Sequence, residues 1–280
     1  MIMFRFLTWA VLCFCSTPFL LFSKEAEGST VIICVSDWHD YTLSQPKDPK
    51  NSNHQLGYMA DLVKAAFANQ SYDVEYLWVP ANRGFQKTKS GKADAFLGAF
   101  ESETKGYIGN KEPIGILRSH YLVSQKENWR YTGYDSLFKA KAIGIWAEYD
   151  YIDPVFSKYF EAKPKNLYFL PNEEDAVERV VRMVNSGRLT AIVGDPGSFN
   201  WYAKQHQKES LVDAGQCLKP EFLYAGFTPA KPKRSKLLSK ILDEGIVSLR
   251  SNGKLEQLLK PYSFQDWSTL KVNSSEAIKE

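Results

Sequence analysis

The sequence predicts an α/β protein made of two similar lobes that are joined by two strands, and three observations support this fold class. Short β-branched or apolar runs alternate with amphipathic helical segments along most of the chain. The order strand, helix, Ser-Gly turn, strand occurs twice, within residues 59–100 and 142–193. No low-complexity linker separates the two series, which favours strands that cross between the lobes near residues 114–123 and 215–224.

The first series of elements forms one compact lobe. The β-branched run at its start is typical of a buried parallel strand, and the following apolar residues recur at helical spacing. The predicted elements are a strand at 31–35, a helix at 59–69, a strand at 72–79, a helix at 82–90 and a strand at 93–100.

The second series repeats this pattern, and helices follow it. Its predicted elements are strands at 142–146 and 167–170, a helix near Tyr151, a helix at 173–185 and a strand at 190–193. Gly91 and Gly187 occupy equivalent Ser-Gly turns, where each is expected to end a helix. Residues 194–198, with the sequence GDPGS, read as a tight turn. Leucine spacing predicts C-terminal helices over 237–249 and 255–259, the second stopped by Pro261.

The N-terminus has the layout of a secretory signal peptide. Arg5 precedes an apolar run from Phe6 to Cys15, and the small residue Ser23 ends the segment. The alternative is a membrane anchor, which needs about 20 apolar residues. Ser16, Thr17 and Pro18 interrupt the run, so we expect residues 1–23 to be a cleaved signal peptide and the mature protein to be exported.

Two cysteines remain after removal of this signal, Cys34 and Cys217. An exported protein can form a disulfide between them, and the long loop that it closes would give a stabilisation of about 4–5 kcal/mol. The alternative is two buried free thiols. The sequence leaves both open, because it does not give the distance between the two Cα atoms.

Composition and motifs exclude several functions. The chain has 35 Lys and Arg against 32 Asp and Glu, which gives a net charge of +3 and no basic stripe for nucleic acid. The GxSxG, HExxH and GxxxxGK[ST] signatures are absent. The four histidines, His39, His54, His120 and His206, lack metal-ligand spacing. These absences remove the simplest enzyme hypotheses without disproving an enzyme, and we expect no metal or cofactor.

Several weak motifs become informative through their order along the chain. They are Gly57–Val63 (GYMADLV), Pro80–Arg83 (PANR), Ser90–Ala95 (SGKADA), Ser186–Arg188 with Asp195, Tyr224–Thr228 (YAGFT), Gly253–Leu255 (GKL) and Pro261–Tyr262. This ordered set resembles a divergent branch of the bacterial extracellular solute-binding proteins of family 3, the type II periplasmic receptors of amino-acid-type ABC transporters. The resemblance covers residues 31–264.

The resemblance implies a periplasmic binding protein type II-like fold that closes on its ligand by a hinge motion. Lobe 1 would comprise residues 24–118 plus 216–280, and lobe 2 residues 119–215. The implied function is a non-enzymatic, periplasmic, monomeric receptor that captures a small polar solute, such as an amino acid or related amine, and delivers it to an ABC permease. The alternatives are a ligand-sensing module for a membrane signalling partner, and a dehydratase-type enzyme that uses Glu101 or Asp195 as acid or base.

The implied binding site lies beyond the carboxyl ends of the strands. Its candidate ligand-binding residues are Trp38, Tyr41, Arg83, Ala99, Phe100, Glu101, Lys105, Trp146, Tyr149 and Asp195. Trp38 and Tyr41 would form an aromatic wall. Arg83 would either meet an anionic group or form a surface salt bridge, and the sequence leaves both open. Asp195 would hold a ligand amine, or would otherwise cap a turn.

Three positions depart from the family pattern. Lys105 replaces the arginine that clamps a ligand carboxylate, and a lysine cannot reproduce that bidentate fork. Glu148 stands where glycine is frequent, and Thr190 stands where a structural aspartate is common. The first departure leaves open a ligand that is not an α-amino acid.

Overall fold

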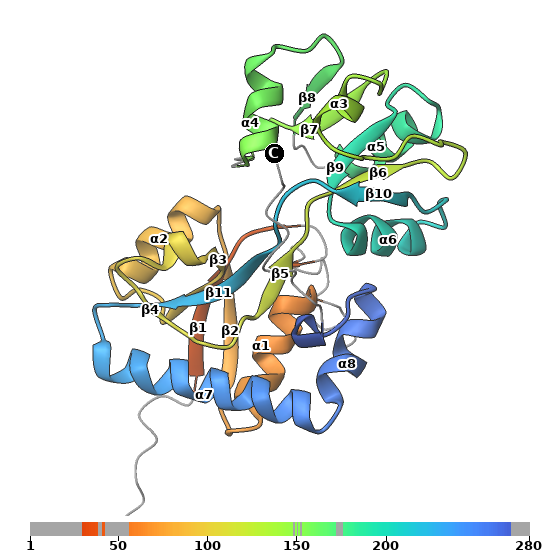
Figure 1. Ribbon diagram of the computed structural model, residues 1–280. Coiled ribbons are helices and arrows are strands. Elements are labelled where there is room, and N and C mark those ends of the chain that lie inside the picture. Colours follow the sequence, from red (N-terminus) through yellow and green to blue (C-terminus); the bar gives the residue numbers. More distant parts are fainter. Residues whose placement is uncertain are drawn as a thin grey trace, which may run out of the picture.

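The structure is a computed structural model that describes residues 30–38, 41–42, 56–147, 149, 151, 153–171 and 176–269. Two α/β lobes, each built on its own sheet, confirm the predicted fold class (Figure 1). The first sheet has the order β2 (Asp73–Trp78), β1 (Thr30–Val35), β3 (Ala95–Phe100), β11 (Glu221–Phe227) and β4 (Ile108–Gly109), and β5 (Gly115–Leu117) also pairs with β11. The second has the order β10 (Val212–Gln216), β6 (His120–Val123), β9 (Ala191–Gly194), β7 (Ile143–Trp146) and β8 (Leu167–Leu170).

Helices cover both faces of the first sheet because alternate residues of its buried strands point to opposite sides. Val31, Ile33 and Val35 of β1 pack into the larger core with α1 (Tyr58–Ala68), α7 (Pro232–Ser251) and α8 (Lys254–Leu259). Cys34, between them in the strand, packs on the other face under α2 (Ala81–Lys89). Short 3₁₀ helices follow β3 and α8, at Glu101–Thr104, Lys260–Tyr262 and Trp267–Thr269.

The second sheet is covered in the same way. Ile143 and Ile145 of β7 pack with α3 (Tyr134–Leu137) and α4 (Pro154–Glu161). Trp146 and Ile192 lie in a separate cluster with α5 (Ala176–Asn185) and Phe199 of α6 (Pro196–Gln205).

The chain crosses between the lobes twice, and the two crossings lie side by side. The first passes through Arg118 and Ser119, between β5 and β6, and the second through residues 217–220, between β10 and β11. The backbone N–H of Cys217 donates to the carbonyl of Ser119 at 2.7 Å, so the two crossings are hydrogen-bonded to each other. Such a narrow two-strand connection can act as a hinge. The predicted lobe limits, at 118/119 and 215/216, stay predictions.

The repeated Ser-Gly turn has the same backbone geometry in both lobes. Gly91 and Gly187 have φ values of 77° and 74°. The N–H after each glycine, of Lys92 and Arg188, donates to a carbonyl five residues earlier at 2.9 Å. Both are Schellman motifs, which end α2 and α5 and confirm the expectation that glycine stops these helices.

Thr190 shows how the second lobe accommodates the missing aspartate. In the first lobe, Asp94 accepts a hydrogen bond from the Ile32 N–H at 3.1 Å and pairs with Arg234 at 3.0 Å. In the second, Thr190 Oγ1 accepts hydrogen bonds from the N–H groups of Lys141 and Ala142 at 3.0 and 3.4 Å. The hydroxyl therefore takes over the structural role without a charge.

The expected tight turn at residues 194–198 is wrong. Asp195 is the N-cap of α6, where Pro196 is the first residue, and its side chain accepts hydrogen bonds from the N–H groups of Gly197 and Ser198. Asp153 and Pro154 begin α4 with the same N-cap and first residue, so that helix starts after Tyr151 and not around it. Asp-Pro is a helix-start pair, because aspartate caps well and proline tolerates the first position.

The structure does not pair Cys34 with Cys217. Both are buried free thiols in different hydrophobic clusters, Cys34 in the first lobe and Cys217 at the second crossing. Burial raises the pKa of the Cys34 thiol and raises that of Cys217 to about 12. The alternative of two free thiols is therefore the one that the structure supports.

We expect neither thiol to react quickly in the folded protein, because the thiolate is the reactive species and both groups are held in the neutral form. Ellman titration of the signal-free chain should show two thiols in denaturant and almost none in native buffer. A reducing agent should leave the Tm unchanged. A fall of several degrees on reduction would contradict the free-thiol assignment.

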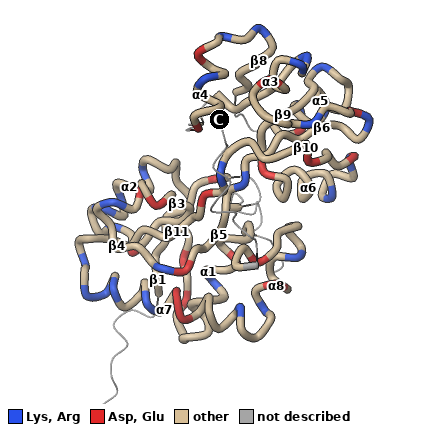
Figure 2. Tube along the Cα trace, in the orientation of Figure 1, with Lys and Arg blue, Asp and Glu red and all other residues tan. Residues whose placement is uncertain are grey.

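The predicted signal peptide at residues 1–23 lies outside the described residues. Within the described ranges, no helix is long and apolar enough to cross a membrane. In the view of Figure 2, the described acidic and basic residues are interspersed over both lobes.

Candidate functional site

A cleft lies between the two lobes beside the crossings. It consists of two cavities, of about 400 and about 580 Å³. Both are lined by Trp38, Leu117, Ser119, Tyr149 and Tyr151, so they are two parts of one cleft. The indole Nε1–H of Trp38, from lobe 1, donates to the Tyr149 hydroxyl of lobe 2 at 2.9 Å and bridges the cleft.

Trp38 and Tyr41 form the predicted aromatic wall. They follow β1 and stack on each other with ring centroids 4.7 Å apart. Tyr41 is buried, and its hydroxyl donates to the carbonyl of Ile116 at 3.1 Å. Gly98 leaves room for the indole, since a Cβ at this glycine would lie 3.3 Å from the Trp38 ring and its φ is 82°. Both the first lobe's core and its hinge strand therefore fix the position of this wall.

The opposite wall comes from the end of β7 and the segment after it. The backbone N–H of Trp146 donates to the Tyr151 hydroxyl at 2.8 Å, which holds the Tyr151 side chain against the end of β7. Burial is the main reason why the pKa of Tyr151 is raised, so its hydroxyl stays neutral. Trp146, Tyr149 and Tyr151 thus present uncharged aromatic groups to the cleft.

Asp195 lines the first cavity, but its carboxylate already has protein partners. One oxygen, Oδ1, accepts from the Gly197 N–H at 2.6 Å and lies 3.3 Å from Nη2 of Arg118. The other, Oδ2, accepts from the backbone N–H of Arg118 at 3.0 Å and from its Nε at 3.3 Å. A ligand amine would therefore have to share this carboxylate with Arg118 and α6.

Arg118 lies on the first crossing, and its guanidinium lies over the Phe264 ring at 5.6 Å. Burial alone would lower the pKa of Arg118, but the charge and hydrogen bonds of Asp195 outweigh it, so the pKa is raised. The ion pair links the hinge to the start of α6 in lobe 2.

Not all of the predicted site residues reach the cleft. Trp38, Tyr41, Trp146, Tyr149 and Asp195 line the first cavity, and Phe100 lines the second.

The other four do not line either cavity. Arg83, Glu101 and Lys105 are exposed, and Ala99 is buried in the cluster beneath α2. The two predicted anion-binding side chains, Arg83 and Lys105, are therefore not part of the described cleft lining.

The sequence reasoning missed the contribution of α6. Phe199, Trp201 and Tyr202 line the first cavity, together with Glu178 of α5. The Trp201 Nε1 and the Tyr202 hydroxyl are buried and have no hydrogen-bond partner among the described residues. Reading Asp195-Pro196 as a helix start would have placed these aromatics on a helix directed at the strand ends.

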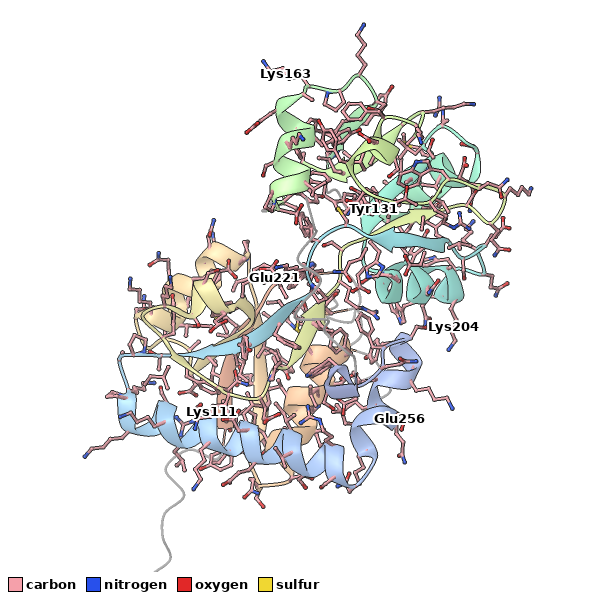
Figure 3. The ribbon with its side chains drawn as sticks, viewed as in Figure 1. Lys111, Tyr131, Lys163, Lys204, Glu221 and Glu256 are labelled. Carbon is pink, nitrogen blue, oxygen red and sulfur yellow. The ribbon has the colours of Figure 1, made fainter. Side chains whose placement is uncertain are left out.

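The second cavity brings carboxylates together. Glu103, Asp153 and Glu221 line it, with Lys219 as the cationic side chain among its described lining residues. Figure 3 shows Glu221 at the crossing between the lobes. Burial raises the pKa of the Glu221 carboxyl above its ordinary value of 4.5, and the charge of Glu103 raises it further.

This carboxyl makes stability depend on pH. The folded protein holds the Glu221 proton more tightly than the unfolded chain does. The stabilisation of the folded state by this protonated carboxyl is therefore fully present below pH 4.5 and is lost as the pH rises through the raised pKa. We expect Glu221→Gln to raise the Tm at pH 7 by a small amount, since solvent screens an exposed side chain. Thermal melts from pH 4 to 8 should show the gain disappearing in acid, and Glu256→Gln on α8 should show no gain. A gain that is independent of pH would contradict this explanation.

Metal chemistry has no support in the described part of the chain. No group of three or more His, Cys, Asp or Glu side chains lies close enough there to hold a metal ion.

Two α/β lobes, joined by adjacent crossings and enclosing a cleft at the strand ends, define the fold of type II periplasmic binding proteins. One similar structure is an ancestral cationic amino acid solute-binding protein, also described as a precursor of cyclohexadienyl dehydratase. It is 15% identical, with a TM-score of 0.64 over 84% of this chain and 96% of that chain.

Two further structures have the same fold. One of them is the second of the substrate-binding domains assigned to an amino acid ABC transporter from Streptococcus pneumoniae. It is 17% identical, with a TM-score of 0.61 over 84% of this chain and 100% of that chain. A histidine kinase sensor domain similar to periplasmic binding proteins is also 17% identical, with a TM-score of 0.56 over 84% and 96%. No protein-family model matches the sequence, and no curated protein matches it. The likeness therefore establishes the fold.

Proposed function

We propose that this protein is an exported receptor that captures a small polar solute, such as an amino acid or related amine, and delivers it to an ABC permease. The observation that carries the proposal is the cleft itself, because its first cavity of about 400 Å³ is lined by aromatic side chains from both lobes. A ligand in contact with both walls stabilises the closed arrangement by its differential affinity for it. The amino acid transporter domain among the similar structures supports this role.

Two features of the carboxylates weigh against a dehydratase-type enzyme. Glu101 is exposed and does not line either cavity. Both carboxylate oxygens of Asp195 are engaged by Arg118 and by the start of α6. A general acid or base must reach the substrate with its carboxyl group.

A sensing role uses the same capture step and differs in the partner that reads the closed state. One of the similar structures is a histidine kinase sensor domain, and this supports sensing as the alternative role. Export through the predicted signal peptide, a periplasmic location and a monomeric state belong to the same proposal. A pull-down of this protein with a permease or a sensor kinase encoded near its gene distinguishes the transport role from the sensing role.

Calorimetry and thermal shift on the signal-free chain test the capture step with amino acids, amines, organic acids and small oligosaccharides. We expect one class to raise the Tm by several degrees and to reduce the radius of gyration in small-angle scattering. Binding without compaction would contradict hinge closure, and lack of binding by every class would contradict the receptor role.

A further inference from the structure

The described lining of the cleft is rich in negative charge. Five carboxylates line its two cavities: Glu178 and Asp195 in the first, and Glu103, Asp153 and Glu221 in the second. Among the described residues that line the two cavities, Lys219 is the one Lys or Arg, and it is exposed. His206 is the one histidine among them. Carboxylates remain in excess even when Arg118 is counted against Asp195 and Arg182, whose Nη1 lies 3.9 Å from Glu178, is counted against Glu178.

A ligand carboxylate would find few partners here. The guanidinium of Arg118 is engaged by both oxygens of Asp195, and Arg83 and Lys105 are exposed outside the cavity linings. Like charges at short range are costly in a partly desolvated cleft. In the second cavity, burial is the main reason why the pKa of Glu221 is raised, and the negative charge of Glu103 raises it further.

The aromatic walls of the first cavity favour a positively charged ligand. The first cavity is lined by the rings of Trp38, Tyr41, Trp146, Tyr149, Tyr151, Phe199, Trp201 and Tyr202. An ammonium group over such a face gains about 0.5–2 kcal/mol from the ring quadrupole. The Tyr202 hydroxyl, which lacks a partner among the described residues, can accept a hydrogen bond from an N–H group. The carboxylate of Glu178 lines the same cavity and is paired on its solvent side with the more exposed Arg182.

We propose that the cleft selects a small organic cation that carries no carboxylate, namely an alkyl or aryl amine, and not an α-amino acid. This inference rests on the proposed receptor function and narrows its ligand class. The amine would lie among the aromatic rings of the first cavity, and the carboxylates of both cavities would favour its charge. A molecule with an added carboxylate would be rejected by the same groups.

Matched pairs that differ only in a carboxylate test the inference directly. Calorimetry at pH 7.5 and low salt would compare cadaverine with lysine, agmatine with arginine, and tyramine with tyrosine. We expect at least one amine to bind, and at least tenfold more tightly than its amino acid. An amino acid that binds as tightly as its amine, or a neutral or anionic solute as the best ligand, would overturn the inference but keep the receptor function. Lack of binding by every solute class would overturn both.

Single substitutions check that the cleft charges are responsible. Glu178→Gln should weaken the best amine about three- to tenfold, since it removes charge without removing volume. Glu256→Gln, on α8 away from the cleft (Figure 3), should leave the affinity unchanged. Equal affinity of the Glu178→Gln variant and the natural chain would contradict the role of this carboxylate.

Discussion

Replacing Asp195 with alanine should lower the free energy of unfolding by about 4 kcal/mol. The substitution leaves the Arg118 guanidinium, whose side chain is 22% exposed, without its buried partner. It also removes the N-cap of α6, which by itself costs about 1 kcal/mol. Urea denaturation followed by circular dichroism measures the change.

The chain supplies a matched control for this prediction. Asp153 caps α4 through the same Asp-Pro pair, and its Oδ1 accepts from Val155 and Phe156 at 2.9 and 3.0 Å. Because no ion pair to Asp153 is found in the described part of the chain, Asp153→Ala should cost only about 1 kcal/mol. Asp195→Asn, which keeps a capping oxygen and loses the charge, should fall between the two. Equal costs for Asp195→Ala and Asp153→Ala would contradict a stabilising role of the ion pair.

Trp38→Ala should weaken ligand binding at least a hundredfold, which corresponds to about 2.8 kcal/mol. Trp38 contributes to both cavities, stacks on Tyr41 and reaches across to Tyr149. Trp38 is partly buried against the core of the first lobe, and aromatic anchors in such positions carry most of the energy of a binding surface. Calorimetry with the best solute from the screen measures the loss.

Two further tryptophan variants distinguish the contribution of the aromatic face of Trp38 from that of its indole N–H and from the general effect of losing a tryptophan. Trp38→Phe keeps an aromatic face and loses the indole N–H, so we expect only about a tenfold loss. Trp129→Ala removes an indole that packs in the second lobe and donates to Ser136, and it should leave the affinity nearly unchanged. A Trp38→Ala affinity within threefold of the natural chain would show that the ligand binds elsewhere.

Much of the fold could be predicted from local pattern. Residues 31–35 and 167–170 read as strands because their runs are short and apolar, and the structure has strands at Thr30–Val35 and Leu167–Leu170. The Ser-Gly turns at Gly91 and Gly187 end their helices for a local steric reason, a positive φ. The start of α6 also has a local signal, the Asp195-Pro196 pair, which the interpretation of residues 194–198 as a tight turn overlooks.

The site could be predicted only in part. Trp38 and Tyr149 lie in the cleft because each follows a buried strand, a position that sequence can locate. Arg83 and Lys105 were selected by motif alone, and whether a side chain on a helix or loop reaches a cavity depends on its direction in space. Trp201 and Tyr202 reach the cleft only because α6 packs across the gap between the lobes, where Trp201 also contacts the core of the first lobe.

The sequence by itself determined the two α/β lobes, their helix stops and the aromatic strand ends, since these depend on periodicity and on backbone preferences of single residues. The tertiary structure alone decided which charges meet. Arg118 and Asp195 are 77 positions apart, and their pairing turns an expected ligand contact into a link between the hinge and lobe 2. Glu103 and Glu221 likewise come from distant segments to the same cavity. Electrostatic interactions depend on distance in space and on burial, and neither is encoded in spacing along the chain.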